Sequence, residues 1–188
     1  MSSIKKIVVM ASGEGTNFQA IIDKGIIVNK VLTNNPKSGI IKRAKDSDHC
    51  ASYLVKPQGE TREEYDKKID YGIPHDTDLI VLAGWMRILS PWFCEKWAGK
   101  IINIHPSLLP AFKGSTNAIE EAYNYGCKVF GATVHWVTPE VDSGSIIDQR
   151  AMQLGDKPLY KIEEMVHTYI EHIMYPQTIK QLIDDGSI

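Results

Sequence analysis

Short apolar runs alternate along the chain with segments in which apolar residues recur at helical spacing. The runs predict strands at residues 6–10, 27–32, 52–55, 79–83 and 101–104, and the helical patterns predict helices at 17–24, 40–46 and 62–70. Strands that alternate with helices are typical of a mostly parallel sheet covered on both faces. We therefore expect an α/β fold.

The pattern changes after Gly126. Residues 129–137 alternate strictly, so that Phe130, Ala132, Val134 and Trp136 share one face and Thr133 and His135 the other. A loop at 139–144 leads to a further strand at 146–152, and the two strands are expected to pair antiparallel. Residues 158–175 have helical spacing, and Pro176 is expected to kink or restart that helix.

Composition narrows the class of protein. A chain of 188 residues is long enough for one catalytic domain, which we take to span 1–188. A net charge of -2 gives no footprint for nucleic acid, and the apolar run at 7–10 is too short for a membrane span. Cys50, Cys94 and Cys127 are odd in number and form no CxxC, which favours reduced thiols in a cytoplasmic protein over disulfides or zinc.

Two polar side chains end the strand at 101–104. Asn103 and His105 are two positions apart, so they should point to the same face, and Pro106 should end the strand. Open α/β sheets bind their ligands at the carboxyl ends of strands. A functional pair is one interpretation, and a structural amide beside a core histidine is the other.

A glycine-rich turn follows the first strand. Gly13 and Gly15 precede a predicted helix, whose free N–H groups and positive dipole end suit a phosphate. The turn is neither a complete GxGxxG nor a Walker motif. The alternative is a tight turn in which Thr16 or Asn17 caps the helix.

Two further segments could be functional. Asp142 lies in a turn between strands, where it could orient or charge His105 or simply bond to its own backbone. Residues 85–89, Trp-Met-Arg-Ile-Leu, could hold a flat ring, although core packing with a solvated Arg87 explains them equally well.

Together these segments resemble the glycinamide ribonucleotide formyltransferases, the folate-dependent enzymes of purine synthesis. The similarity covers nearly the whole chain and rests on residues 12–17 (Ser-Gly-Glu-Gly-Thr-Asn), 82–91, 103–110 (Asn-Ile-His-Pro-Ser-Leu-Leu-Pro), 112–114, 131–135, 137–138 and 141–142. The block at 103–110 is specific to the formyltransferase superfamily, and the turn with Thr16 and Asn17 narrows it to the purine enzyme.

The resemblance implies a fold and a reaction. The fold is a three-layer, doubly wound, mostly parallel seven-stranded sheet. The reaction moves the formyl group of 10-formyltetrahydrofolate, a cosubstrate, to the amine of glycinamide ribonucleotide by direct attack through a tetrahedral intermediate, without metal or covalent intermediate. The partners would be these small molecules, with no nucleic acid or membrane, and the protein would be a monomer or homodimer.

The resemblance also implies residue roles. Asn103, His105 and Asp142 would be catalytic, Gly15, Thr16 and Asn17 would hold the substrate phosphate, and Glu171 would lie near the ribose. The folate would contact Arg62, Met86, Arg87, Ile88, Leu89, Asn103, Thr138, Pro139, Glu140, Val141 and Asp142. For Glu171 the alternative is a solvated residue, because Glu164, His167, Thr168 and Glu171 form a polar helical stripe.

Two positions depart from the family pattern. Many relatives have a histidine shortly after the Phe-Lys-Gly turn, whereas residues 115–119 here contain none. Ser145 replaces a frequent proline, from which we expect a looser turn around Asp142.

Other functions remain as alternatives. A formyltetrahydrofolate deformylase would use the same Asn-His-Asp set with water, but such relatives carry an extra N-terminal domain, and here the predicted sheet begins at once. Methionyl-tRNA formyltransferase would need a second, basic domain. Ser107 with His105 and Asp142 could form a hydrolase triad, although no G-x-S-x-G surrounds Ser107. A non-catalytic phosphate-binding module would leave Asn103 and His105 unexplained.

Overall fold

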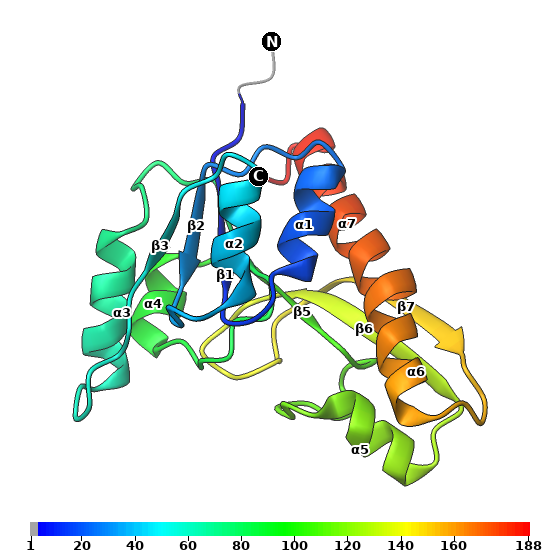
Figure 1. Cartoon of the computed structure of the whole chain (residues 1–188). Helices are drawn as coiled ribbons and strands as arrows, with labels where there is room; N and C mark the ends of the chain where they lie inside the picture. The colour runs from blue at the N-terminus through cyan, green and yellow to red at the C-terminus, as the bar shows by residue number, and fades with distance from the viewer. Residues whose placement is uncertain (1–3) are drawn as a thin grey trace.

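A seven-stranded sheet forms the middle layer of the computed structural model, which describes residues 4–188 (Figure 1). The strands are β1 (Ile7–Ala11), β2 (Lys30–Thr33), β3 (Ala51–Tyr53), β4 (Leu79–Leu82), β5 (Ile101–His105), β6 (Val129–Trp136) and β7 (Ile146–Gln153), in the order β3-β2-β1-β4-β5-β6-β7. Strands β1 to β5 pair parallel, and β6 pairs antiparallel with β5 and β7. The predicted α/β class, the mostly parallel sheet and the antiparallel β6–β7 pair are confirmed.

Helices cover both faces of the sheet. They are α1 (Thr16–Asp23), α2 (Gly39–Asp46), α3 (Arg62–Tyr71), α4 (Pro91–Lys96), α5 (Ala118–Tyr125), α6 (Leu159–Met165), the π-helix η1 (Val166–Glu171) and α7 (His172–Asp184). Alternate residues of β1 enter two separate cores: Val9 packs with α1, α2 and α5 to α7, while Val8 packs with α3 and α4. This two-sided burial explains why the strands are continuous apolar runs.

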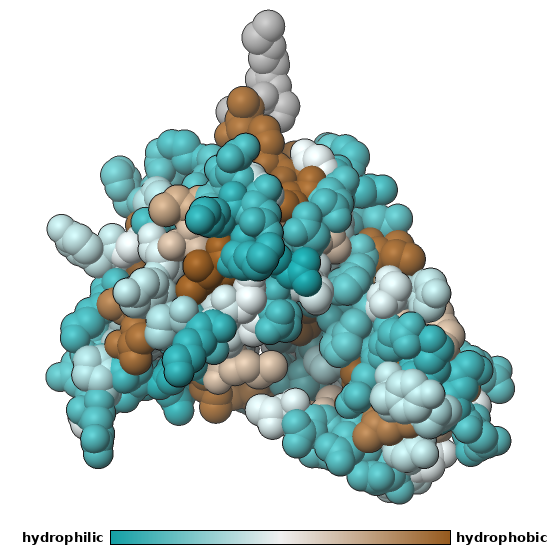
Figure 2. All heavy atoms as spheres, viewed as in Figure 1, coloured by the Kyte–Doolittle hydropathy of each residue, from teal (hydrophilic) through white to brown (hydrophobic). Residues whose placement is uncertain are grey.

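The residues outside these two cores form the surface of the protein. In the view of Figure 2, hydrophilic residues cover most of the face, and apolar residues are scattered among them. Within residues 4–188, no helix combines the length and apolar character needed to cross a bilayer. Of the three free cysteines, Cys50 is exposed and Cys94 is buried.

Some element predictions were wrong. Strand β2 begins at Lys30 instead of residue 27, because Asn29 crosses to β1: its N–H donates to the Ile7 carbonyl and its Oδ1 accepts from the Ile7 N–H. Helices α4 and α5 were not predicted at all. Helix α4 has only six residues, and Ser90 caps it by accepting from the Phe93 N–H at 3.3 Å. Short, aromatic-rich helices of this kind give little periodic signal.

The C-terminal helix departs from the α form upstream of its proline. Helix α7 continues through Pro176, so the helix does not restart there, and the irregular segment is η1. A kink at Pro176 stays a prediction. Ile162, Val166, Ile170 and Met174 are all buried, at steps of four. An α-helix has 3.6 residues per turn, so such a stripe would drift around it. A π-turn takes more residues and keeps the stripe on the core.

Candidate active site

A cavity of about 580 Å³ opens at the carboxyl ends of β1, β4 and β5. Its position is the point where the strand order reverses, between β1 and β4, which is where doubly wound sheets bind ligands. The wall is formed by residues 13–17, 82–89, 94, 103–106, 114–116, 135, 137–139, 141, 142, 167 and 171. Nearly all of the site residues named from sequence therefore share one cavity.

Asn103 and His105 both line this cavity from β5, as their spacing predicted. The antiparallel register sets Asn103 opposite His135 and His105 opposite Thr133. The Asn103 Nδ2 lies 3.3 Å from the His135 Nε2. One amide hydrogen can thus be held by the imidazole while the second stays free for a ligand.

Both ring nitrogens of His105 face oxygen atoms. Its Nε2 lies 3.1 Å from the Phe112 carbonyl oxygen, and its Nδ1 lies 3.4 Å from Asp142 Oδ2. A neutral imidazole can donate from only one nitrogen, whereas an imidazolium can donate from both. An imidazolium would therefore satisfy both oxygen atoms, and a neutral ring would satisfy one of them.

Asp142 lies between two histidines. Its Oδ2 accepts from the Gly114 N–H at 3.0 Å, and its Oδ1 lies 3.5 Å from His135 Nε2. Burial, the largest single influence, opposes ionisation of this carboxyl. Interaction with His135, the charge of His105 and the Gly114 N–H together outweigh it and lower the pKa of Asp142. The group is a carboxylate at neutral pH.

Backbone contacts fix the turn that carries Asp142. Asp142 itself has a left-handed φ of +49°, and a Cβ at Gly144 would clash with the Trp136 carbonyl oxygen. The Trp136 N–H donates to the Ser145 carbonyl at 2.9 Å. These contacts hold the turn on both sides of Asp142, and the looser turn expected from Ser145 stays a prediction.

The turn after β1 presents unused donors to the cavity. Gly15 is the N-cap of α1, with a φ of +74° and no side-chain cap, so the alternative in which Thr16 or Asn17 caps the helix is wrong. A Cβ at Gly15 would lie 2.7 Å from Ile40 Cβ, which explains the glycine. The first N–H groups of α1 remain available to an anion.

Glu171 is connected to that turn. Its Oε2 accepts from Asn17 Nδ2 at 2.9 Å and lies 3.0 Å from His167 Nδ1. Glu171 is 4% exposed, so the alternative of a solvated glutamate is wrong. The hydrogen bond with Glu171 raises the pKa of His167 more than burial lowers it.

The segment after β4 supplies an apolar rim to the cavity. Met86 and Ile88 are 68% and 50% exposed, whereas Leu89 is 4% exposed and packs in the core. The Arg87 guanidinium lies over the Tyr65 ring at 5.0 Å from its centroid. Core packing thus explains Leu89, and the exposed apolar pair is open to a ligand.

Two of the predicted folate contacts lie outside the cavity wall. Arg62 is exposed at the start of α3, and Glu140 is exposed and paired with Lys113 at 2.7 Å. Thr138, Pro139 and Val141 do line the cavity. A role for Arg62 and Glu140 stays a prediction.

Two histidines in the wall, His135 and His167, were not predicted as site residues. His135 Nδ1 lies 2.9 Å from the Trp136 carbonyl oxygen, so this nitrogen carries a proton; a neutral ring then accepts from Asn103, and a charged ring donates to Asp142. The alternation of β6 predicted that His135 shares a face with Thr133. It could not show which residue lies opposite His135. For His167, the spacing of four to Glu171 was the available signal.

A serine hydrolase triad is not formed. The Ser107 Oγ donates to the Ala111 carbonyl at 2.6 Å instead of to His105. Among the residues that the structure describes, no group of three or more His, Cys, Asp or Glu side chains could hold a metal ion.

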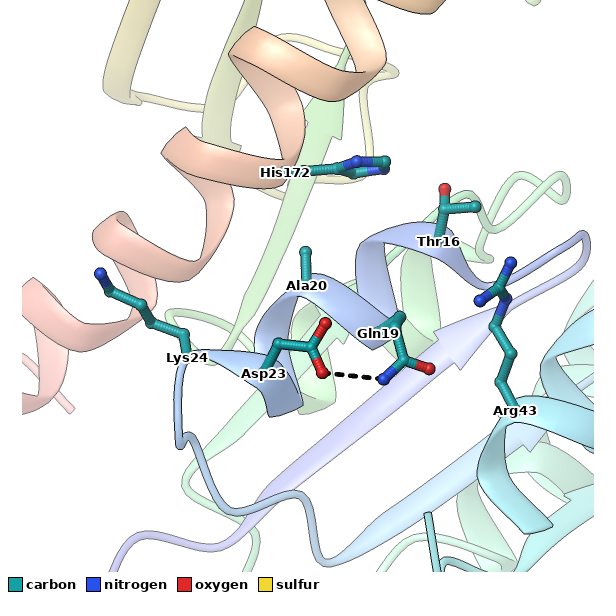
Figure 3. Close-up of a pocket in the computed structure, with 7 residues that line it drawn as sticks. All are labelled: Thr16, Gln19, Ala20, Asp23, Lys24, Arg43 and His172. Carbon is teal, nitrogen blue, oxygen red and sulfur yellow. Dashed lines mark hydrogen bonds between the residues drawn. The ribbon is translucent and has the colours of Figure 1, made fainter. Parts of the chain in front are cut away.

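A second cavity, of about 440 Å³, lies on the other side of the α1 N-terminus (Figure 3). Its lining residues are Thr16, Gln19, Ala20, Asp23, Lys24, Arg43 and His172. In Figure 3 the His172 ring and the Arg43 guanidinium lie toward Thr16, and Gln19 is bonded to Asp23 at 2.9 Å. Thr16 is the one residue that lines both cavities.

Comparison with known proteins gives consistent matches over the whole fold. A family described as formyl transferase matches residues 5–179. The phosphoribosylglycinamide formyltransferase of Bacillus subtilis is 38% identical over 96% of this chain and 95% of its own length. The trifunctional purine biosynthetic protein adenosine-3 of Homo sapiens is 37% identical over 97% of this chain, which spans 19% of that longer protein. The crystal structure of phosphoribosylglycinamide formyltransferase from Bacillus halodurans superposes with a TM-score of 0.90 at 33% identity, covering 97% of each chain.

Proposed function

The chain belongs to the formyl transferase family, and we propose that it transfers the formyl group of 10-formyltetrahydrofolate to the amine of glycinamide ribonucleotide in purine biosynthesis. The observation that carries this function is that Asn103, His105, Asp142 and the Gly15 turn line one cavity. Relatives named for this activity align over nearly the whole chain.

The amine attacks the formyl carbon and produces a tetrahedral intermediate with negative charge on oxygen. We propose that Asn103 donates a hydrogen bond directly to that oxygen, because His135 can hold one amide hydrogen and leave the other free. A single preorganised donor of this kind is commonly responsible for about 10²- to 10³-fold of the rate. His135 acts here as a positioning residue.

His105 supplies positive charge beside the developing oxyanion. Collapse of the intermediate breaks the bond between the formyl carbon and the folate nitrogen, which must gain a proton, while the attacking amine loses one. His105 can provide the proton, directly or through water. The Asp142 carboxylate favours the charged ring and balances its charge.

Two parts of the cavity wall fit the two substrates. The N–H groups of α1 suit the phosphate, and Gly15, Thr16 and Asn17 form that turn. The nearby Glu171 carboxylate can accept from ribose hydroxyls. The exposed Met86 and Ile88 side chains, in the segment after β4, suit a flat, apolar ring system.

Several properties of the whole protein follow as proposals. All site residues come from one chain, so either a monomer or a homodimer would be competent. Small substrates and a net charge of -2 require no nucleic acid or membrane partner. Free cysteines fit a cytoplasmic protein. We take residues 1–188 to be one catalytic domain, of which the family match covers 5–179.

An assay with both substrates tests the proposal. Purified protein, 10-formyltetrahydrofolate and glycinamide ribonucleotide should yield tetrahydrofolate and formylated amine in equal amounts. Loss of folate formyl without formylated amine would indicate a deformylase. Absence of turnover, with ligand binding retained, would indicate a binding module.

A further inference from the structure

His167 is connected to the turn after β1 through one oxygen atom of Glu171. Glu171 Oε2 accepts from Asn17 Nδ2 at 2.9 Å and lies 3.0 Å from His167 Nδ1. Through this oxygen the imidazole is connected to the first turn of α1. The His167 side chain is 47% exposed and lines the same cavity as Gly15 and Thr16.

The second ring nitrogen of His167 is free to bind a ligand. Because Nδ1 faces a carboxylate, it carries the proton of a neutral ring, and Nε2 makes no hydrogen bond within residues 4–188. When the ring is charged, Nε2 becomes a second donor. Among residues 4–188, the hydrogen-bond partner of His167 is therefore Glu171, on the side of the ring opposite Nε2.

The cavity offers few cations for a phosphate. The basic side chains in its wall, among the described residues, are Arg87, His105, His135 and His167. Arg87 lies over Tyr65, and the other two histidines flank Asp142. The first turn of helix α1 contains no acidic residue, and its last turn contains no basic residue. Within this wall, His167 is the remaining cation for a group of about -1.5 to -2 charge, since Arg43 and His172 line the second cavity.

Helix geometry supports the placement. His167 and Glu171 lie within the π-helix η1, and π-turns are frequent at functional sites. The same segment keeps Val166 and Ile170 in the core. The π-helix therefore keeps its apolar residues in the core and also directs the His167 and Glu171 side chains to the cavity.

We propose that His167 binds the 5′-phosphate of glycinamide ribonucleotide by donating from Nε2, while Glu171 holds the opposite nitrogen. The proposal rests on the proposed function for the identity of the substrate. It assigns His167 as the residue that gives the enzyme its preference for a phosphorylated substrate. The contact would be a charge-assisted hydrogen bond, a strong class of polar contact.

The decisive experiment pairs one substitution with two substrates. The His167→Gln variant and the wild type are assayed with glycinamide ribonucleotide and with the same compound lacking its phosphate. We expect kcat/KM to fall about 10- to 100-fold for the phosphorylated substrate, as for one charged hydrogen bond, with little change for the other. Equal losses for both substrates would show that His167 acts only through Glu171, and the proposal would be wrong.

His172→Gln is the matched control. It is the same substitution five positions along, in a residue whose ring faces the second cavity (Figure 3). This variant should behave like the wild type with both substrates. A phosphate-dependent loss in His172→Gln and none in His167→Gln would place the phosphate in the second cavity and overturn the proposal.

The pH dependence gives an independent readout. The charged groups near His167 are Glu171 on its own helix, Glu163 on α6 and His172 on α7, while Thr16 and Asn17 of α1 are uncharged. The raised pKa keeps the ring charged below that value, and the charge is lost as the pH rises through it. KM for the phosphorylated substrate should therefore rise as the pH increases through this raised pKa. In His167→Gln this rise should disappear, and an unchanged profile would contradict the proposal.

A binding experiment separates this proposal from the proposed function. Ribose 5-phosphate and ribose are titrated into wild type and His167→Gln, with a thermal melt to confirm folding. Weaker binding of ribose 5-phosphate alone supports the contact even if the wild type fails to formylate the amine. Equal binding of ribose 5-phosphate to both proteins would refute the contact even if formyl transfer is observed.

Discussion

Asn17 donates from Nδ2 to Glu171 Oε2 over 2.9 Å, although 154 positions separate the two residues along the chain. The contact joins the first turn of α1 to the end of η1. It is buried, and a buried carboxylate is tolerated only when it is well bonded. The contact therefore connects the turn proposed to hold the phosphate to the residue expected beside the ribose.

Glu171→Gln should weaken binding of glycinamide ribonucleotide. The amide keeps the size of the side chain but loses the charge that holds Asn17 and His167. We expect KM for the ribonucleotide to rise about 10-fold, the value of one charged hydrogen bond, with less change in kcat. Glu164→Gln, an exposed glutamate paired with Lys161, is the matched control and should leave KM unchanged. A normal KM in Glu171→Gln would remove this carboxylate from substrate binding.

Asn103→Ala removes the proposed oxyanion donor. Its kcat should fall about 10²- to 10³-fold, while the affinity for both substrates changes less. Asn124→Ala, in the exposed part of α5, is the control for the substitution itself. Steady-state kinetics with both substrates measures the difference, and a near-normal kcat in Asn103→Ala would rule out the role.

Asp142→Asn removes the charge beside His105 while keeping the size of the side chain. We expect kcat to fall about 10²- to 10⁴-fold, the usual range for acid–base groups, because the charged ring is no longer favoured. His105→Ala should be about as damaging. The double variant should be scarcely worse than either single one, since residues that act as a unit are not additive. Fully multiplicative losses would show that the two residues act independently.

The apolar rim can be tested with two isoleucines of equal exposure. Ile88 is 50% exposed in the cavity wall, and Ile146 is 48% exposed on β7, outside it. Because both tolerate solvent, Asp at either position should leave the fold intact. Calorimetry should show weaker binding of a folate analogue to Ile88→Asp only, with ribonucleotide binding unchanged. Equal losses for both ligands would point to misfolding.

Tyr175 connects α7 to the strands that carry the site. Its buried hydroxyl lies 3.0 Å from the Leu82 carbonyl oxygen and 3.2 Å from that of Ile102. Tyr175→Phe should lower the free energy of unfolding by about 1–2 kcal/mol, the cost of a buried hydrogen bond. Tyr169→Phe, at an exposed position of η1, should change it little. Urea denaturation of both variants makes the comparison, and equal stabilities would mean that the hydroxyl contributes nothing.

The sequence predicted the elements whose signal is local. The apolar run of β5 and the alternation of β6 are properties of a few adjacent residues, and the glycine turn before α1 is another. The antiparallel pairing of β6 and β7 was also visible from the short loop between them.

What the sequence could not show depends on long-range register. Asn103 faces His135 only because β5 and β6 pair antiparallel in one register, and the β6–β7 ladder shifts at Val134 and His135. A slip of one residue would send His135 to the other face. The interpretation of Glu171 as solvated failed for the same reason, since its partner Asn17 lies at the other end of the chain.

The π-helix also sets the direction in which the side chains of α7 point relative to those of α6. Inserting one residue into an α-turn changes an i→i+4 bond into i→i+5, so η1 can be described as one added residue between α6 and α7. Without it, everything downstream would turn by about 100° about the helix axis. Tyr175 would then face away from β4 and β5, and Ile179 would leave the core. The number of residues between Ile162 and Tyr175 is therefore under stricter constraint than their identities.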